Sequence, residues 1–201
     1  MKNFYKIVFL FAVVISFSAC QTDDSEDVSF VTEYAVFEYE PEIVLELGST
    51  FEPSAVATQG GTPLEVIVSG DVDTNTVGVY DVAYSAVNSD GFEASAFQKV
   101  VVHDPSIVGT DVSGNIVDAN NGSRTGIITL VEGTTSIFYC TDFGFAGNFP
   151  MYFQMDGDVI SEIPQVYPFG ATSVELTYSP ATQTFTTLIA PYGFGYTFVY
   201  Q

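Results

Sequence analysis

Few side chains in this sequence have the types and spacing of a catalytic site. His103 is the only histidine, so a histidine-dependent nucleophile would need this residue, and no serine lies in a G-x-S-x-G motif. Asp156 and Asp158 flank Gly157 and could act as the acid pair of a glycosidase, but "MDGD" is more simply a hairpin turn. We therefore predict a protein that is not an enzyme, and we expect His103 to be a solvated residue at a strand end.

One acidic stretch has the alternation of a cation-binding loop. In "GDVDTN", Asp71, Asp73 and Asn75 are spaced like the oxygen ligands of calcium loops. A hard cation needs about six to eight oxygens, and here Gly78 is offset and no acid occupies the closing position. We expect a turn that leads into a strand at Tyr80, with calcium binding as the open alternative. The sequence contains no phosphate loop and no Cys/His metal spacing, so we assign no cofactor and no metal site.

Aromatic side chains beside glycines are the best candidates for ligand binding. "DFGFAGNFPMYF" and "APYGFGYTF" place several rings next to glycines, so these rings can stay exposed. An exposed ring can stack on the apolar C–H face of a sugar, while a tyrosine hydroxyl remains in water. Core packing is the alternative, because a β domain of this size needs large side chains to fill it. The candidates are Phe143, Phe145, Phe149, Tyr152, Tyr192, Phe194 and Tyr196, with Asp142 and Asn148 as partners for hydroxyl groups.

The first 20 residues have the features of a secretory leader. Two lysines precede an apolar run over residues 7–17, which is shorter than the roughly 20 residues of a spanning helix. The end of this run, "FSAC", resembles the lipobox of bacterial lipoproteins, although Phe17 replaces the usual aliphatic residue. The resemblance implies cleavage before Cys20 and lipidation of its thiol. The alternative is an ordinary signal peptide with an incidental cysteine.

An acidic segment follows directly after this cysteine. Residues 21–32 include "QTDDSED", which cannot bury apolar area and is expected to form a disordered, solvated tether. The run is similar to the acidic export signal of Bacteroidetes lipoproteins, and this similarity implies a lipid-anchored protein on the outer face of the outer membrane. A merely soluble spacer is the alternative. The residues of the export signal would be Asp23, Asp24, Glu26 and Asp27.

The charge of the chain argues against one class of partner. The formal net charge is −21, and after loss of the leader only Lys99 and Arg124 remain basic. Nucleic acids are bound through clusters of lysine and arginine, so we predict no nucleic-acid partner. Cys140 would be the only other cysteine, and its place in the apolar run "IFYCTDF" indicates a small buried hydrophobe.

Strand signals dominate the chain after the tether. "GVYDVAYSAVN" and "FEASAFQKVVVHD" alternate in hydrophobicity on either side of "NSDG", which predicts a hairpin with Gly91 at positive φ. The chain ends on an apolar run, which suggests a terminus held within a sheet. The other expected strands are "EIVLEL", "LEVIVS", "TGIITLVE", "TSIFYCT", "PMYFQM", "GDVISEI", "SVELTYS", "TFTTLIA" and "YTFVYQ".

The order of turns and strands resembles two known kinds of domain. Residues 33–104 are similar to a bacterial immunoglobulin-like domain of surface lipoproteins, through "LELGSTFEPSAVAT" and the predicted hairpin. Residues 105–201 resemble an all-β domain of unknown function in lipoproteins encoded near Sus-type glycan-uptake systems, through "FYCTDFGFAG" and "MDGDVISEI". We expect an all-β protein, in which an immunoglobulin-like β-sandwich precedes a second antiparallel β-sandwich or barrel.

These observations lead to a functional hypothesis and an alternative. The hypothesis is a non-catalytic surface lipoprotein whose first domain is a spacer and whose second domain binds an extracellular glycan for an outer-membrane uptake or adhesion system. The alternative is a structural or protein-interaction subunit of a membrane complex, without a small ligand. A degenerate hydrolase is a third, weaker alternative.

Overall fold

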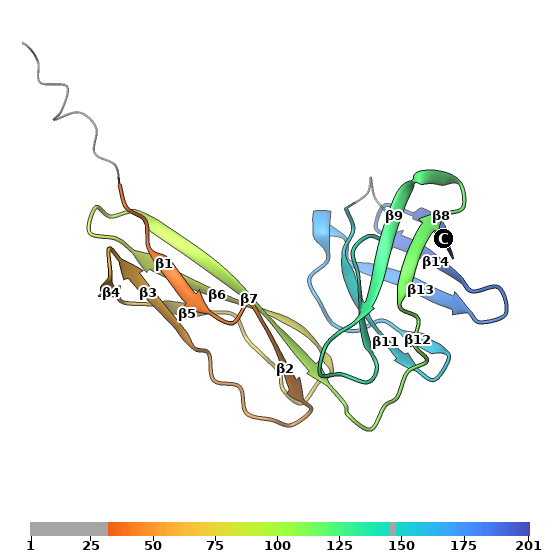
Figure 1. The fold of residues 1–201 in the computed structure, drawn as a ribbon, viewed down its shortest axis with the longest axis horizontal. Coiled ribbons are helices and arrows are strands. Elements are labelled where there is room, and N and C mark those ends of the chain that lie inside the picture. Colours follow the sequence, from red (N-terminus) through yellow and green to blue (C-terminus); the bar gives the residue numbers. More distant parts are fainter. Residues whose placement is uncertain (1–31, 145–147) are drawn as a thin grey trace, which may run out of the picture. The chain divides into compact units, whose positions relative to one another are not determined.

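The structure is a computed structural model that describes residues 32–144 and 148–201 (Figure 1). Residues 34–201 form one compact unit, which contains all the strands described below. Six predicted functional residues lie outside the described ranges. They are Cys20, Asp23, Asp24, Glu26, Asp27 and Phe145.

The fold is nearly all β, as the sequence predicts. Strands before residue 104 and strands after it belong to different sheets within the described residues. The first group comprises β1 (Val36–Tyr39), β2 (Glu42–Glu46), β3 (Ala55–Gln59), β4 (Thr62–Leu64), β5 (Ile67–Ser69), β6 (Gly78–Val87) and β7 (Glu93–His103). The second comprises β8 (Gly114–Asp118), β9 (Asn121–Leu130), β10 (Ile137–Cys140), β11 (Met151–Asp156), β12 (Val159–Ser161), β13 (Ser173–Ser179), β14 (Thr184–Ala190) and β15 (Phe194–Tyr200).

The first group forms a sandwich of two sheets. One sheet has the strand order β1-β3-β4, and the other has the order β2-β7-β6-β5. β2 runs parallel to β7, whereas the other pairs are antiparallel. The core between the sheets contains the buried Val82, Tyr84, Val100 and Val102. "LEVIVS" is not one strand, because the chain crosses from one sheet to the other between β4 and β5.

The hairpin of β6 and β7 contributes side chains both to the core of the sandwich and to its outer face. Its turn forms as predicted, with Gly91 at φ +84° and the Asn88 side chain accepting hydrogen bonds from two backbone N–H groups of the turn. Because side chains alternate along a strand, Val82, Tyr84 and Ala86 are buried while their neighbours point outward. The same alternation buries Val100 and Val102 of β7 in the sandwich core.

The second group forms one eight-stranded antiparallel sheet that is nearly closed. Its order is β12-β11-β10-β9-β8-β15-β14-β13, and the two edge strands β12 and β13 contact each other. The interior is filled largely by aromatic rings, including the fully buried Phe138, Phe153, Phe185 and Phe198. β15 lies between β8 and β14, so the chain does end inside a sheet, as expected.

A third apolar cluster joins side chains from both groups of strands. It contains Val79 of β6 and Val101 of β7 together with Ile137, Tyr152 and Ile163 from the second group. The backbone N–H of Val79 also donates a 2.8 Å hydrogen bond to the carbonyl of Pro164. The outward face at this end of the hairpin is therefore covered by the second group of strands.

Candidate ligand-binding sites

Several of the predicted binding residues are core residues in the structure. Phe143 and Phe149 are fully buried, and the Phe143 ring packs against Phe153, Phe185 and Phe198 with centroids 5.6 to 5.8 Å apart. The Phe143 N–H also donates to the Phe149 carbonyl at 3.0 Å. Placing these two rings on an exposed binding face was therefore wrong, because both rings point inward and help to fill the barrel.

Asp142 satisfies buried backbone groups beside these two rings. Its Oδ1 accepts hydrogen bonds from the N–H groups of Gly144 (2.9 Å) and Phe149 (3.0 Å), which would otherwise be buried without a partner. Burial raises the pKa of the Asp142 carboxyl, while these two hydrogen bonds and Arg124 act in the opposite direction. Asp142 is thus a buried structural residue and not a partner for sugar hydroxyls, whereas Asn148 is exposed.

Tyr196 is only partly buried, but its ring is already covered. The guanidinium of Arg124 lies 4.5 Å from the centre of the Tyr196 ring, and it also forms an ion pair with the buried Asp118. Gly144 packs against the same ring, and a Cβ added to Gly144 would lie only 2.3 Å from Cδ2 of Tyr196. These contacts assign Tyr196 a packing role.

Tyr192 and Phe194 are exposed, as a binding surface requires. Their exposed fractions are 42% and 48%, and their rings are stacked with centroids 5.9 Å apart and planes 12° from parallel. The Tyr192 hydroxyl donates a 2.6 Å hydrogen bond to the carbonyl of Phe169, a residue that is itself 52% exposed. We call Phe169, Tyr192 and Phe194 the aromatic platform. Phe169 was missed in the sequence, where "PFG" is the only signal for it.

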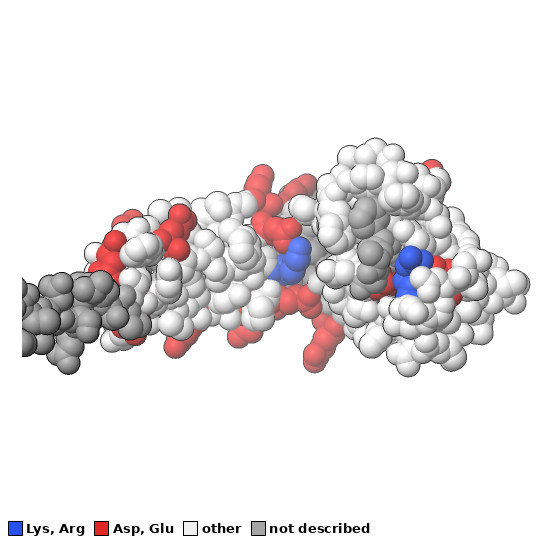
Figure 2. All heavy atoms as spheres, turned by 90° about the horizontal axis from the view of Figure 1, so that it is seen from above, with Lys and Arg blue, Asp and Glu red and all other residues white. Residues whose placement is uncertain are grey.

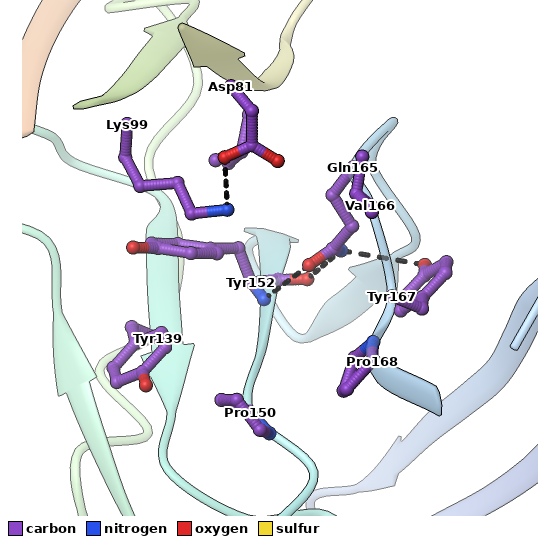
Figure 3. Close-up of a pocket in the computed structure, with 10 residues that line it drawn as sticks. Asp81, Lys99, Tyr139, Pro150, Tyr152, Gln165, Val166, Tyr167 and Pro168 are labelled. Atoms are coloured by element: carbon purple, nitrogen blue, oxygen red, sulfur yellow. Dashed lines mark hydrogen bonds and ion pairs between the residues drawn. The ribbon is translucent and has the colours of Figure 1, made fainter. Parts of the chain in front are cut away.

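A second candidate site lies beside the covered end of the β6–β7 hairpin (Figure 3). The hairpin register places Val79 opposite Val101 and Asp81 opposite Lys99, all on the outward face. The valine pair is buried in the third apolar cluster, whereas the side chains of Asp81 and Lys99 are 35% and 40% exposed. The ion pair therefore lies at the margin of the covered surface.

A pocket of about 310 Å³ opens at this margin. Tyr139 and Tyr152 lie on one side of it, with ring centroids 4.8 Å apart, and residues 166–168 lie on the other side (Figure 3). Pro150 lies below Tyr139 and Tyr152 in the same view, and the ion pair is above them. We call the space lined by Asp81, Lys99, Tyr139, Tyr152, Gln165 and Tyr167 the junction pocket.

Hydrogen bonds hold the walls of the junction pocket in place. Gln165 bonds to the backbone of Tyr152 twice, donating from Nε2 to the carbonyl (2.7 Å) and accepting at Oε1 from the N–H (2.9 Å). The hydroxyl of Tyr152 donates to Glu42 (2.8 Å), and that of Tyr167 donates to Glu162 (2.6 Å). Burial, followed by these carboxylates, raises the pKa of both hydroxyls, so they remain protonated donors.

Little of the junction pocket is predictable from the sequence. Tyr152 is among the candidate ligand-binding residues, but no sequence pattern indicates its contact with Val79 and Val101 of the first group of strands. The alternation of "GVYDVAYSAVN" puts Asp81 on the polar face of its strand, but its pairing with Lys99 depends on the register of the hairpin. Gln165 and Tyr167 had no signal at all, because they follow β12 in a segment without regular structure.

Other residues with possible chemistry have structural roles. His103 is buried beside β2, where its carbonyl accepts from the N–H of Leu47 (2.8 Å), so the expectation of a solvated histidine was wrong. Cys140 is fully buried, as predicted, and burial raises the pKa of its thiol. Asp156 and Asp158 flank the β11–β12 turn as predicted, and Asp158 accepts from the hydroxyl of Thr110 at 2.7 Å.

The "GDVDTN" stretch forms the expected turn. Asp73 accepts hydrogen bonds from the N–H of Asn75 (3.0 Å) and the hydroxyl of Thr76 (2.7 Å), and these bonds lower the pKa of its carboxyl. Within the described part of the chain, no group of three or more His, Cys, Asp or Glu residues is arranged to hold a metal ion. The same described residues include no helix that is long and apolar enough to cross a bilayer.

Comparisons with known proteins identify the first group of strands. Residues 37–102 match the family model described as "Bacterial surface protein, Ig-like domain", which confirms the immunoglobulin-like prediction for this part of the chain. Among solved structures, a lipoprotein from Bacteroides thetaiotaomicron matches with 25% sequence identity and a TM-score of 0.40, over 84% of this chain and 100% of that chain. A comparison with curated proteins gave no match.

Proposed function

We propose that the protein is a non-catalytic lipoprotein, anchored in the outer membrane and facing the cell exterior, that binds extracellular glycans for an uptake or adhesion system. The aromatic platform carries this proposal. Leaving a large apolar side chain in water forgoes about 1.5–3 kcal/mol of burial energy. Three exposed rings, two of them stacked and the third on a residue whose backbone carbonyl accepts from Tyr192, therefore indicate an interaction surface.

The geometry of the platform suits a sugar. The rings of Tyr192 and Phe194 are nearly parallel, and sugar rings present flat apolar C–H faces that pack well on aromatic rings. The hydrogen bond to Phe169 fixes the Tyr192 ring, so little side-chain freedom is lost on binding. The exposed Asn148 offers a polar group on the same domain for sugar hydroxyls.

Binding to polysaccharides tests this proposal. Residues 21–201, which contain every described residue, would be run through affinity gels that contain soluble polysaccharides. We expect retardation in at least one gel, and loss of it in the variant with both Tyr192→Ala and Phe194→Ala. Phe97→Ala is the matched control, because Phe97 is 67% exposed on the Ig-like domain. Equal retardation of the double variant and wild type would exclude the platform as the glycan site.

The proposed location rests on the leader and on the Ig-like domain. A lipid on Cys20 would hold the chain to the membrane, because each buried acyl methylene contributes about 0.8 kcal/mol. The acidic run after it would direct the anchor outward, and the matched family is one of bacterial surface proteins. We expect protease added to intact cells to remove the wild type. Replacing the acids of residues 23–27 with Ser or Asn should make the protein protease-resistant, and Cys20→Ala should abolish lipid incorporation.

A protein-docking role is the second candidate, and one observation favours it. Phe97 of β7, Ile67 of β5 and Val87 of β6 are exposed on the outward face of the Ig-like domain. Apolar residues grouped on a sheet face are typical of protein interfaces. A photo-crosslinker at position 97 on intact cells should then capture an outer-membrane uptake protein, and Phe97→Ser should remove that partner in co-purification.

The charge of the surface supports the exclusion of nucleic acids as partners. Figure 2 shows acidic side chains spread along one face with few basic atoms between them. The basic residues of the described ranges are Lys99 and Arg124, and both are engaged in ion pairs with aspartates. A phosphate backbone would meet repulsion, because its binding requires several free basic side chains.

A further inference from the structure

The junction pocket has the construction of a small-molecule site that is separate from the aromatic platform. Its volume of about 310 Å³ is at the lower end of the range of about 300–1,000 Å³ for ligand pockets. Such sites combine apolar and aromatic walls with a few placed polar groups. Here Tyr139, Tyr152 and Tyr167 line the walls, and one ion pair supplies the polar end.

The walls are fixed before any ligand arrives. The Gln165 side chain forms two hydrogen bonds with the Tyr152 backbone and also donates to the carbonyl of Ile163 at 3.3 Å. The hydroxyls of Tyr152 and Tyr167 donate to Glu42 and Glu162. These groups orient the rings and leave little capacity for new hydrogen bonds. The aromatic walls can therefore offer a ligand mainly their apolar faces, at small entropic cost.

Asp81 and Lys99 can still bind polar groups of a ligand. An ammonium has three N–H donors and a carboxylate has about four lone-pair positions, whereas the ion pair joins one nitrogen to one oxygen. Within the described residues, the structure shows no other ion pair for either side chain. A donor and an acceptor thus lie side by side at one end of an aromatic pocket, as Figure 3 shows.

This combination matches two adjacent hydroxyl groups on a ring with apolar C–H faces. One hydroxyl can accept from Lys99 while its neighbour donates to Asp81, and the ring can pack against Tyr139 or Tyr152. The local charge argues against an acidic ligand, because Glu42, Asp81 and Glu162 outnumber the single ammonium. We propose that the junction pocket binds one ring of a neutral sugar through the Asp81–Lys99 pair.

The test uses monosaccharides, so it does not depend on the polysaccharide binding proposed for the platform. Residues 21–201 would be titrated with methyl glucoside, methyl galactoside, glucuronate and tetramethylammonium, and followed by amide NMR. We expect saturable shifts for at least one neutral glycoside at the amides of Val79, Tyr152 and Gln165. Shifts there from glucuronate or tetramethylammonium alone, or no shifts there from either neutral glycoside, would overturn the proposal.

Substitutions in the pocket test whether the glycoside binds there and not elsewhere on the protein. Asp81→Asn and Lys99→Met should each weaken binding of the neutral glycoside at least about tenfold, as expected for a hydrogen bond to a charged group. Asp90→Asn, at the exposed turn of the same hairpin, is the matched control and should bind like wild type. Unchanged affinity in both pocket variants would contradict the assignment. Unchanged glycoside affinity in both pocket variants, together with loss of polysaccharide binding in the Tyr192/Phe194 variant, would leave the platform supported and the pocket refuted.

Discussion

Asp81 and Lys99 face each other across the β6–β7 hairpin, and Oδ1 of Asp81 lies 2.5 Å from Nζ of Lys99. The preceding outward pair, Val79 and Val101, is buried by the second group of strands. A shift of either strand by one residue would turn its member of this pair, Asp81 or Lys99, toward the sandwich core. The register that builds the core thus also places a polar pair at the mouth of an aromatic pocket.

The ion pair is expected to contribute little to folding. Both side chains are more than one-third exposed, and exposed ion pairs contribute about 0.2–1 kcal/mol. A double-mutant cycle of Asp81→Asn and Lys99→Met, measured by urea unfolding, should therefore give a coupling free energy below about 1 kcal/mol. A coupling of several kcal/mol would show that the pair is a structural element, and loss of sugar binding in either variant could then reflect a distorted pocket.

The division of the aromatic residues into core and surface can be measured directly. Phe143→Ala removes a ring packed among Phe153, Phe185 and Phe198, so we expect a loss of about 3–5 kcal/mol in the free energy of unfolding. Tyr192→Ala removes a half-exposed ring and should cost less than about 1 kcal/mol. Equal losses for the two variants would contradict the burial difference seen here.

Strands with local signals could be predicted from the sequence. β13 and β14 begin and end where "SVELTYS" and "TFTTLIA" do, because each alternates and is bounded by turn residues. β8 was missed, since "GNIVD" has only two large apolar residues and depends on pairing with β9 and the distant β15. The fold class therefore follows from local patterns, whereas the order of strands in the barrel does not.

The candidate sites were harder to predict because burial is a tertiary property. Phe143 and Phe194 both lie beside glycines, yet one is fully buried and the other is 48% exposed. Beside Phe143, the Asp142 carboxylate accepts hydrogen bonds from the buried N–H groups of Gly144 and Phe149, and this contact between residues apart in the chain has no signal in the sequence. No comparable local signal joins Lys99 to Tyr152, because the pocket brings together residues far apart in the chain.

Gly144 should be among the least replaceable positions of the barrel. Its φ is +133°, and a Cβ would lie 2.3 Å from the Tyr196 ring, which Arg124 covers. We expect Gly144→Ala to destabilise the protein by more than about 2 kcal/mol, from backbone strain plus overpacking. Gly193→Ala is the control, because φ is +70° but no described atom lies within 4 Å of its Cβ position, and about 1 kcal/mol is expected. Thermal unfolding of both variants provides the measurement. Similar losses of stability in the two variants would show that the contact with Tyr196 is unimportant.

Asp142 should make the stability of the protein depend on pH in an unusual direction. Burial raises its pKa above the ordinary value near 4, so the folded chain binds this proton more tightly than the unfolded chain does. The ionised side chain then destabilises the fold at neutral pH, and this effect decreases as the pH falls through the raised pKa toward 4. Relative to Asp142→Asn, which does not titrate, the wild type should gain stability over that interval.

The comparison with Asp142→Asn isolates this one carboxyl group. Hydrogen bonds lower the pKa values of Asp73, Asp104 and Asp111, which act in the opposite direction, and these residues are the same in both proteins. Their contributions cancel in the difference between the two unfolding free energies, provided that the sites are independent. Urea unfolding at several pH values from 7 down to about 4 provides the measurement. A difference that stays constant with pH, or that favours the variant as the pH falls, would show that Asp142 does not carry a raised pKa.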